Sequence, residues 1–308
     1  MSTDSDRVSF GIKTTPMNTT YDEIVRIWRD ADTVPAIEHA WLWDHLVPLR
    51  GPVTAPLHEG WTLLAALAAQ TERLRLGLLV SSNRTRPPAV LAKMAATTDM
   101  IAHGRLIFGI GVGGTRVRGD FRHWGGQNPA IREFEAYGVP LVAPVEGIAA
   151  LAESCTIIRR MWTEASPFDF DGRFYQLKGA ICEPKPRQRP HPPILIGGYG
   201  ERTLRVIAEH ADIWNIPGPP FLSVEDFRRK RAVLDEHCAA MGRDPGEITR
   251  SVQIFLSGDD PAATRALAAE LIDAGVQQVI LALQPPVRPA QWVADEVIEP
   301  LRAAVPTG

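Results

Sequence analysis

The sequence predicts a (β/α)8 barrel with insertions after the fourth strand and before the fifth. Eight short apolar runs alternate with helical segments, and no stretch of linker composition divides the chain. The runs at residues 75–80 and 105–114 enclose one helix with almost no spare residue, as expected for two parallel strands buried on both faces. A doubly wound sheet followed by a second domain is the alternative. Since no linker separates two halves, we expect a single barrel domain over residues 1–308.

The elements follow one another in a regular order along the chain. Residues 168–177 resemble a hairpin with a two-residue turn at Asp171-Gly172. Residues 115–140 show little periodicity, and a loop of that length is usually functional or disordered. The predicted strands cover residues 8–13, 40–45, 75–80, 105–114, 194–198, 212–216, 248–256 and 276–283. The predicted helices cover residues 21–32, 59–71, 86–104, 142–162, 201–210, 224–241, 261–274 and 289–304.

Composition and charge exclude several classes of protein. A net charge of −3 provides no basic field for nucleic acid, and no lysine-rich block suggests a membrane surface. The three cysteines are far apart, and the histidines lack the spacing of metal ligands, so we expect neither disulfides nor a metal site. The polar, acidic N-terminus is unlike a signal peptide, and no apolar run approaches the roughly 18 residues of a membrane span. A cytoplasmic, soluble protein is therefore expected.

Asp44-His45 is the first candidate for catalysis, because it follows the second strand at the edge where barrel enzymes keep their catalytic groups. Histidine exchanges protons near neutral pH, and an adjacent carboxylate can fix its tautomer or raise its basicity. The alternative is a histidine in a surface loop beside a helix-capping aspartate. The bare dipeptide leaves both interpretations open.

Glycines mark the ends of two other strands. Gly109-x-Gly111-x-x-Gly114 has the spacing of a dinucleotide-binding motif, but residues 115–119 do not open the amphipathic helix that such a motif requires. In a barrel, the same glycines would form a floor beneath a planar ring. Gly197 and Gly198 precede a helix whose amides suit a phosphate, although a tight turn would also require glycine. Asn215 ends the sixth strand, where its amide can bind a ligand or cap the loop.

Taken together, several stretches resemble the bacterial luciferase-like monooxygenase superfamily. The likeness covers most of residues 8–216, and it is closest to the branch that uses the deazaflavin coenzyme F420. The stretches that carry it are Ser9-Phe10-Gly11-Ile12, Trp41-Leu42-Trp43-Asp44-His45-Leu46, Thr71-Glu72-Arg73-Leu74-Arg75-Leu76-Gly77, Gly104-Arg105-Leu106-Ile107-Phe108-Gly109-Ile110-Gly111 and Pro192-Pro193-Ile194-Leu195-Ile196-Gly197-Gly198.

The resemblance implies hydride transfer between F420 and a small organic substrate. It implies that His45, with Asp44 beside it, faces the coenzyme ring and manages the associated proton. It also implies a homodimer, because dimers are common among similar proteins. The positions that it assigns to coenzyme binding are Leu79 and Val80 at a bulge behind the ring, often with a non-prolyl cis peptide, Gly111 and Gly113 lining the pocket, Gly197 and Gly198 at the phosphate, and Asn215 nearby.

Two alternatives and two departures accompany this resemblance. FMN in the same fold would permit monooxygenation, and a non-catalytic flavin-binding relative is the third possibility. Gly114 stands where some relatives carry a catalytic glutamate, which argues against a sugar-phosphate dehydrogenase. Residues 115–130 form a longer and more basic segment than expected, which is either a lid that contacts substrate or the acidic coenzyme tail, or an exposed insertion.

Overall fold

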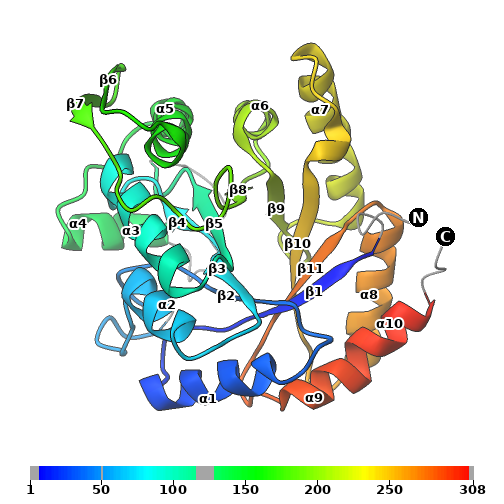
Figure 1. The fold of residues 1–308 in the computed structure, drawn as a ribbon. Coiled ribbons are helices and arrows are strands. Elements are labelled where there is room, and N and C mark those ends of the chain that lie inside the picture. The colour runs from blue at the N-terminus through cyan, green and yellow to red at the C-terminus, as the bar shows by residue number, and fades with distance from the viewer. Residues whose placement is uncertain (1–6, 50, 116–127, 305–308) are drawn as a thin grey trace.

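The computed structural model describes residues 7–49, 51–115 and 128–304, which form the predicted (β/α)8 barrel (Figure 1). All neighbouring barrel strands are parallel, in the order β3-β2-β1-β11-β10-β9-β8-β5-β4, and pairing of β3 with β5 closes the ring. We call the end where the strands begin the base, and the end where they finish the mouth. The barrel strands are β1 (Ser9–Lys13), β2 (His39–Leu42), β3 (Arg75–Leu78), β4 (Ser81–Ser82), β5 (Leu106–Gly111), β8 (Ile194–Gly197), β9 (Ile213–Pro217), β10 (Thr249–Phe255) and β11 (Gln278–Ala282).

Two separate apolar clusters fill the molecule, because successive residues of a strand point to opposite faces. The smaller cluster fills the inside of the barrel and consists of Trp41, Leu79, Ile107, Leu195, Ile213 and Ile280. Strand residues of the opposite parity, such as Leu42, Phe108 and Trp214, belong to a larger cluster between the strands and the surrounding helices. The inside of the barrel is therefore a packed core.

The helices surround the barrel (Figure 1), and several of them begin at side chains that accept from their first amides. Thr20 and Glu23 form a capping box at α1, and Ser223 and Asp226 form another at α7. The helices are α1 (Tyr21–Asp32), α2 (Gly60–Ala68), α3 (Pro88–Ile101), α4 (Pro129–Ala136), α5 (Pro144–Thr163), α6 (Glu201–His210), α7 (Val224–Ala240), α8 (Pro261–Asp273), α9 (Ala290–Val293) and α10 (Glu299–Ala304). No helix in the described residues is both long and apolar enough to cross a membrane.

The barrel departs from the predicted elements at two strands and at the last helix. The second strand ends at Leu42, so Asp44 and His45 lie in the loop beyond it. The third strand is interrupted after Leu78 and resumes as β4, and the Leu79-Val80 peptide bond between the two pieces is cis, as the resemblance implies. The helix predicted over residues 289–304 is divided by a π-helical turn at Ala294–Ile298.

The hairpin of β6 (Phe168–Asp171) and β7 (Gln176–Ala180) lies beside α5 (Figure 1), but its turn differs from the prediction. The prediction of a two-residue turn at Asp171-Gly172 was wrong, because Asp171 pairs with Gln176 and the loop between these two residues is longer. The Glu153 carboxylate on α5 accepts hydrogen bonds from the N–H groups of residues 173, 174 and 175, and it thereby holds this wider loop. A short-range dipeptide signal could not reveal that distant acceptor.

The insertion after β5 contains a helix that the sequence did not predict. α4 begins after Asn128, whose side chain accepts from the Ala130 N–H, and Phe134 anchors it because that ring is fully buried. The predicted aperiodic segment at residues 115–140 is therefore wrong at its second half. Residues 116–127, which hold most of the predicted lid or insertion, lie outside the described residues.

Candidate active site

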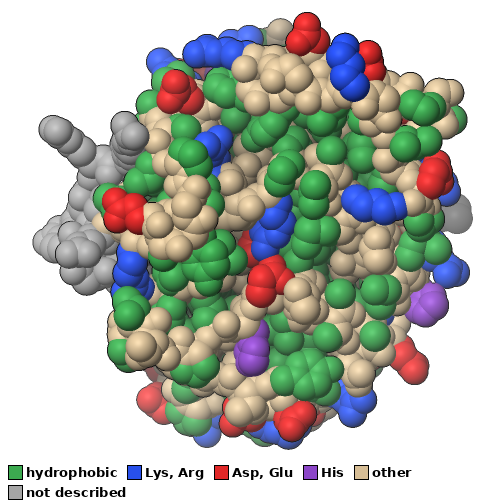
Figure 2. Space-filling model, turned by 90° about the vertical axis from the view of Figure 1, so that its left-hand side faces the viewer, with side chains coloured by type: hydrophobic (Ala, Val, Ile, Leu, Met, Phe, Trp, Pro, Cys, Tyr) green, Lys and Arg blue, Asp and Glu red, His purple; other side chains and the backbone are tan. Residues whose placement is uncertain are grey.

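A cavity of about 1060 Å³ opens at the mouth of the barrel. Its lining includes side chains at or near the ends of most barrel strands, which is where a barrel brings distant segments together. The face at the left of Figure 1, turned toward the viewer in Figure 2, shows a histidine, basic groups and acidic groups gathered near its centre among hydrophobic side chains. The lining residues that lie in different strands or in the loops after them include Lys13, His45, Val80, Gly113, Pro217 and Gln253.

His45 lines this cavity and is held by a carboxylate that the sequence did not reveal. Its Nδ1 lies 3.1 Å from Glu133 Oε2, and the Leu46 N–H donates to Glu133 Oε1 at 2.5 Å. Glu133 is buried, whereas the His45 side chain is 33% exposed. A carboxylate at Nδ1 favours the tautomer with a proton on that nitrogen, so that Nε2 carries the lone pair. Among the described residues, no hydrogen bond engages His45 Nε2.

Asp44 also borders the cavity, but it is bonded to Arg86. The two Arg86 terminal nitrogens donate to the Asp44 carboxylate at 2.7 and 3.0 Å, and the Ser82 N–H approaches it at 3.4 Å. Burial raises the pKa of Asp44, and the bonds from Arg86 oppose that shift. Arg86 also bonds Glu59, the residue that caps α2. The expectation that Asp44 supplies the carboxylate for His45 is therefore corrected: the hydrogen-bond partner of His45 is Glu133, and Asp44 ties its loop to Arg86.

Val80 separates the cavity from two of the predicted glycines. A Cβ added at Gly111 would lie 2.7 Å from Val80 Cγ2, and one added at Gly197 would lie 3.1 Å from Val80 Cγ1. Both glycines are needed because the Val80 side chain rests on them. Leu79, Val80 and Gly113 line the cavity, whereas Gly111 and Gly197 lie behind Val80 and are not part of the lining.

Gly113 reaches the cavity wall in a conformation that suits glycine, with φ of +80°. A Cβ there would lie 2.4 Å from Ser82 Oγ, so the loop after β5 passes tightly over the end of β4. Gly114 lies beside it in the lining, and a Cβ at that position would meet Ala130 of α4 at 2.4 Å. The position where some similar proteins carry a glutamate is thus filled by the packing of α4.

Gly198 and Asn215 bond to each other through their backbones, which changes the predicted phosphate site. The Gly198 N–H donates to the Asn215 carbonyl at 3.1 Å, and the Gly198 carbonyl accepts from Trp214 Nε1 at 2.7 Å. The Asn215 side chain is buried and donates to Ser251 Oγ at 2.9 Å. The Gly198 amide is therefore occupied. α6 has no side-chain N-cap, so no side chain occupies its first amides, and Tyr199, two residues before the helix, lines the cavity.

Lys13 is a second polar residue of the cavity that the sequence did not single out. It is the last residue of β1, and its Nζ donates to Gln253 Oε1 at 2.5 Å. Burial lowers the pKa of Lys13 to about 8. The position of Lys13 at the end of a predicted strand was a usable signal, whereas Glu133 lies in the unpredicted helix and had none.

Taken as chemistry, the cavity offers a buried carboxylate that orients an imidazole, a lysine, and apolar walls. An imidazole whose second nitrogen is held by a carboxylate can accept or donate a proton at an oxygen placed against it. A cavity of this size lies at the upper end of the usual range for ligand sites, about 300–1,000 Å³, so it can hold a large organic ligand.

Comparison with known proteins places the chain in a family. Residues 7–302 match the model of the luciferase-like monooxygenase family, so the chain belongs to that family. A phthiodiolone/phenolphthiodiolone dimycocerosates ketoreductase of Mycobacterium sp. (strain JLS) is 34% identical over 224 residues. This match covers 70% of the chain and 53% of that protein, so the chain matches only about half the length of this relative.

Two solved structures illustrate the range of similar folds. An F420-dependent secondary alcohol dehydrogenase in complex with an F420-acetone adduct has a TM-score of 0.80 at 16% identity, with 96% of this chain and 99% of that one covered. The monooxygenase RslO1 from Streptomyces bottropensis has a TM-score of 0.74 at 20% identity, with 94% and 99% covered. At such identities, these likenesses establish the shared barrel fold.

Proposed function

We propose that this chain is an F420-dependent oxidoreductase that interconverts a ketone and a secondary alcohol. The observation that carries the proposal is the His45–Glu133 pair, which presents an imidazole held by a buried carboxylate to the large cavity at the mouth. The names of the ketoreductase relative and of the F420-dependent alcohol dehydrogenase support the same reaction class. The whole chain, residues 1–308, would act as one barrel domain.

The residues around the cavity fit a tricyclic coenzyme. The branched side chain of Val80 faces the cavity, and the glycines behind it leave room for it against the barrel wall. In this position, the side chain would support the flat face of a ring. Gly113 keeps the loop after β5 close without a side chain in the way. The uncapped first amides of α6 would receive a phosphate. When bound there, the deazaflavin would supply two-electron hydride chemistry.

His45 would handle the proton of the substrate oxygen. In the direction of ketone reduction, the imidazolium would donate a proton from Nε2 to the oxygen as negative charge develops on it. Glu133 would hold the ring through Nδ1 and stabilise the charged imidazolium. The Asp44–Arg86 pair would keep the loop that carries His45 in place, because its two hydrogen bonds are made within the protein interior.

An FMN-dependent monooxygenase is the second candidate, and the likeness to RslO1 favours it. A flavin-binding relative without catalysis is the third. The discriminating experiment titrates the purified protein with F420 and with FMN by fluorescence, and then follows oxidation of reduced F420 without oxygen in the presence of simple ketones.

We expect F420 to bind at least about tenfold more tightly than FMN, a difference of roughly 1.4 kcal/mol, and the ketones to oxidise the reduced coenzyme. Tighter binding of FMN, with oxygenation of the same ketones when reduced FMN and oxygen are supplied, would contradict the proposal in favour of the monooxygenase. Binding of F420 without turnover of any ketone or secondary alcohol would support the non-catalytic relative.

A further inference from the structure

Lys13 extends its ammonium across the mouth of the barrel toward β10. Its Nζ donates to Gln253 Oε1, although β11 lies between β1 and β10 in the sheet. This contact fixes the orientation of the glutamine amide, because only its oxygen can accept from an ammonium. The Gln253 Nε2 group and the Lys13 ammonium are therefore neighbouring hydrogen-bond donors on the lining of the same cavity.

Among the described residues, the carboxylates that line the cavity are engaged by other partners. Glu23 accepts from Thr20 in the capping box of α1, Asp44 binds Arg86, and Glu133 binds His45. No ion pair joins Lys13 to an acid within residues 7–49, 51–115 and 128–304. The titratable groups that line the cavity with it are Glu23 and Arg26 from α1, Asp44 and His45 from the loop after β2, Glu133 from α4, and Tyr199 from the loop before α6.

A charge that is withdrawn from water is costly unless it is paired. Burial lowers the pKa of Lys13 to about 8, which leaves the side chain largely protonated at neutral pH. The protein thus holds a positive group in a cavity with a neutral amide as its partner. A ligand with a negative charge would complete the pair, and two adjacent donors match the two oxygens of a carboxylate.

The walls beyond Lys13 are apolar. Pro217 ends β9 and Pro219 follows it, Leu283 follows β11, and Pro285 and Pro286 continue that loop along the cavity. An unbranched hydrocarbon segment would pack there without unsatisfied polar groups. The cavity therefore has a positive point, an apolar stretch and the imidazole of His45.

We propose that Lys13 and Gln253 form a carboxylate-binding subsite, and that the substrate is an oxo acid or the corresponding hydroxy acid. The carboxylate accepts from Lys13 Nζ and Gln253 Nε2, while the carbonyl oxygen lies at His45. This inference rests on the proposed function for the reacting end of the substrate, but the charge of Lys13 tests it separately.

The test compares 4-oxopentanoate and 5-oxohexanoate with their methyl esters, using reduced F420 without oxygen. The variants are Lys13→Met, which keeps the length of the stem without its charge, and Lys178→Met as the matched control on the exposed hairpin. The binding readout is NMR of protein labelled at its lysine side chains, with and without 4-oxopentanoate. The Lys13 signal is assigned by its loss in Lys13→Met, and the chain's other lysines are Lys93, Lys178, Lys185 and Lys230.

We expect the acids to be preferred over the esters by roughly 10- to 100-fold in kcat/KM, mainly through KM. Lys13→Met should abolish this preference, and Lys178→Met should keep it. In the wild type, the pKa of Lys13 should rise from about 8 when 4-oxopentanoate is added. Affinity for the acids, but not for the esters, should fall as pH rises through that value.

Equal use of acids and esters by the wild type, or a preference that survives in Lys13→Met, would overturn the subsite. A carboxylate could also come from the acidic tail of the coenzyme. If Lys13→Met weakens F420 binding and leaves the ratio of acid to ester unchanged, Lys13 serves the coenzyme and the proposal is wrong. If no ketone is reduced at all, the proposed function fails, and the NMR titration alone decides: an unchanged Lys13 pKa rejects the subsite, and a raised one supports it.

Discussion

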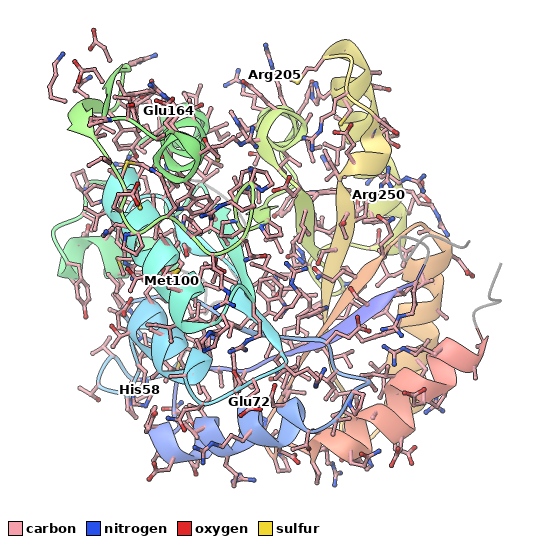
Figure 3. The ribbon with its side chains drawn as sticks, viewed as in Figure 1. His58, Glu72, Met100, Glu164, Arg205 and Arg250 are labelled. Carbon is pink, nitrogen blue, oxygen red and sulfur yellow. The ribbon has the colours of Figure 1, made fainter. Side chains whose placement is uncertain are left out.

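The two ends of the barrel use their polar residues in different ways. At the base, arginines and carboxylates bind the backbone: Arg105 donates to the carbonyls of Ala68, Thr71 and Leu74 at 2.7 to 2.8 Å, where α2 leads into β3. At the mouth, Lys13 and His45 line an open cavity, and within the described part of the chain each has one side-chain hydrogen-bond partner. Figure 3 labels Arg250 on the right, at the start of β10, and His58 on the left, in the loop before α2. The polar residues of the base therefore join backbone segments, whereas Lys13 and His45 at the mouth face open space.

Two histidines of the same βα unit show the physical cause of this difference. His39 is buried at the base, where its Nδ1 accepts from Trp41 Nε1 at 2.7 Å, and burial lowers its pKa to about 3. Gly11 makes room for it, since a Cβ there would lie 1.7 Å from His39 Nδ1. His45 lies partly exposed beside Glu133. A neutral packing role suits His39, whereas a proton-exchanging role requires the setting of His45.

Asp32 shows how the base treats a carboxylate. It accepts from the N–H groups of Glu72, Arg73 and Leu74 at 2.7 to 3.0 Å. Burial alone would raise the pKa of Asp32, but these hydrogen bonds outweigh burial and lower it. The carboxylate thereby joins the end of α1 to the turn before β3, as a structural link between two βα units.

We expect the largest effect from Arg86→Met, because it removes a structural ion pair from the mouth of the barrel. Asp44 would remain buried without its partner, and we expect a loss of about 3–5 kcal/mol in the free energy of unfolding. Denaturant unfolding of the purified variant measures it. The double variant Arg86→Met with Asp44→Asn should recover part of the loss, and a single variant as stable as the wild type would contradict the role given to this pair.

Glu133→Gln tests the role of the carboxylate at the mouth, because it keeps the shape of the side chain and removes its charge. We expect turnover to fall by roughly 10- to 100-fold, since Glu133 holds the His45 ring through Nδ1. Steady-state kinetics with reduced F420 and a ketone measure the effect. Asp32→Asn at the base is the matched control and should leave turnover near the wild-type value. The same loss in both variants would mean that stability, not orientation, is affected.

His39→Gln tests the packing role of His39 at the base, and its expected effect on the free energy of unfolding is smaller. The folded protein holds His39 neutral down to about pH 3, whereas the unfolded chain takes up a proton below about pH 6.5, so stability is lost as pH falls through that window. Glutamine keeps an acceptor for Trp41 and does not titrate. Between pH 7 and pH 5.5, we expect the variant to lose about 1 kcal/mol less unfolding free energy than the wild type. If the free energies of unfolding of the two proteins change with pH in the same way, His39 is not held neutral in the folded protein.

The sequence was a good guide to the fold because each barrel strand is a short apolar run and several helices carry explicit caps, such as Thr20 with Glu23. The rule that ligand groups follow strand ends predicted His45 and Gly113, and the resemblance predicted Val80; all three line one cavity. It could not reveal Glu133, which comes from an insertion without periodicity and meets His45 across 88 positions of the chain. Nor could it show that Gly111 and Gly197 serve the packing of Val80, since a glycine looks the same in both roles.

The most direct test of the central claim replaces His45 by alanine and measures coenzyme binding and turnover separately. His237→Ala, on the outer helix α7, is the matched control. We expect His45→Ala to bind F420 nearly as well as the wild type and to reduce ketones roughly 10²- to 10⁴-fold more slowly, with His237→Ala unaffected in both. Turnover by His45→Ala at the wild-type rate would contradict the assignment of proton exchange to this imidazole.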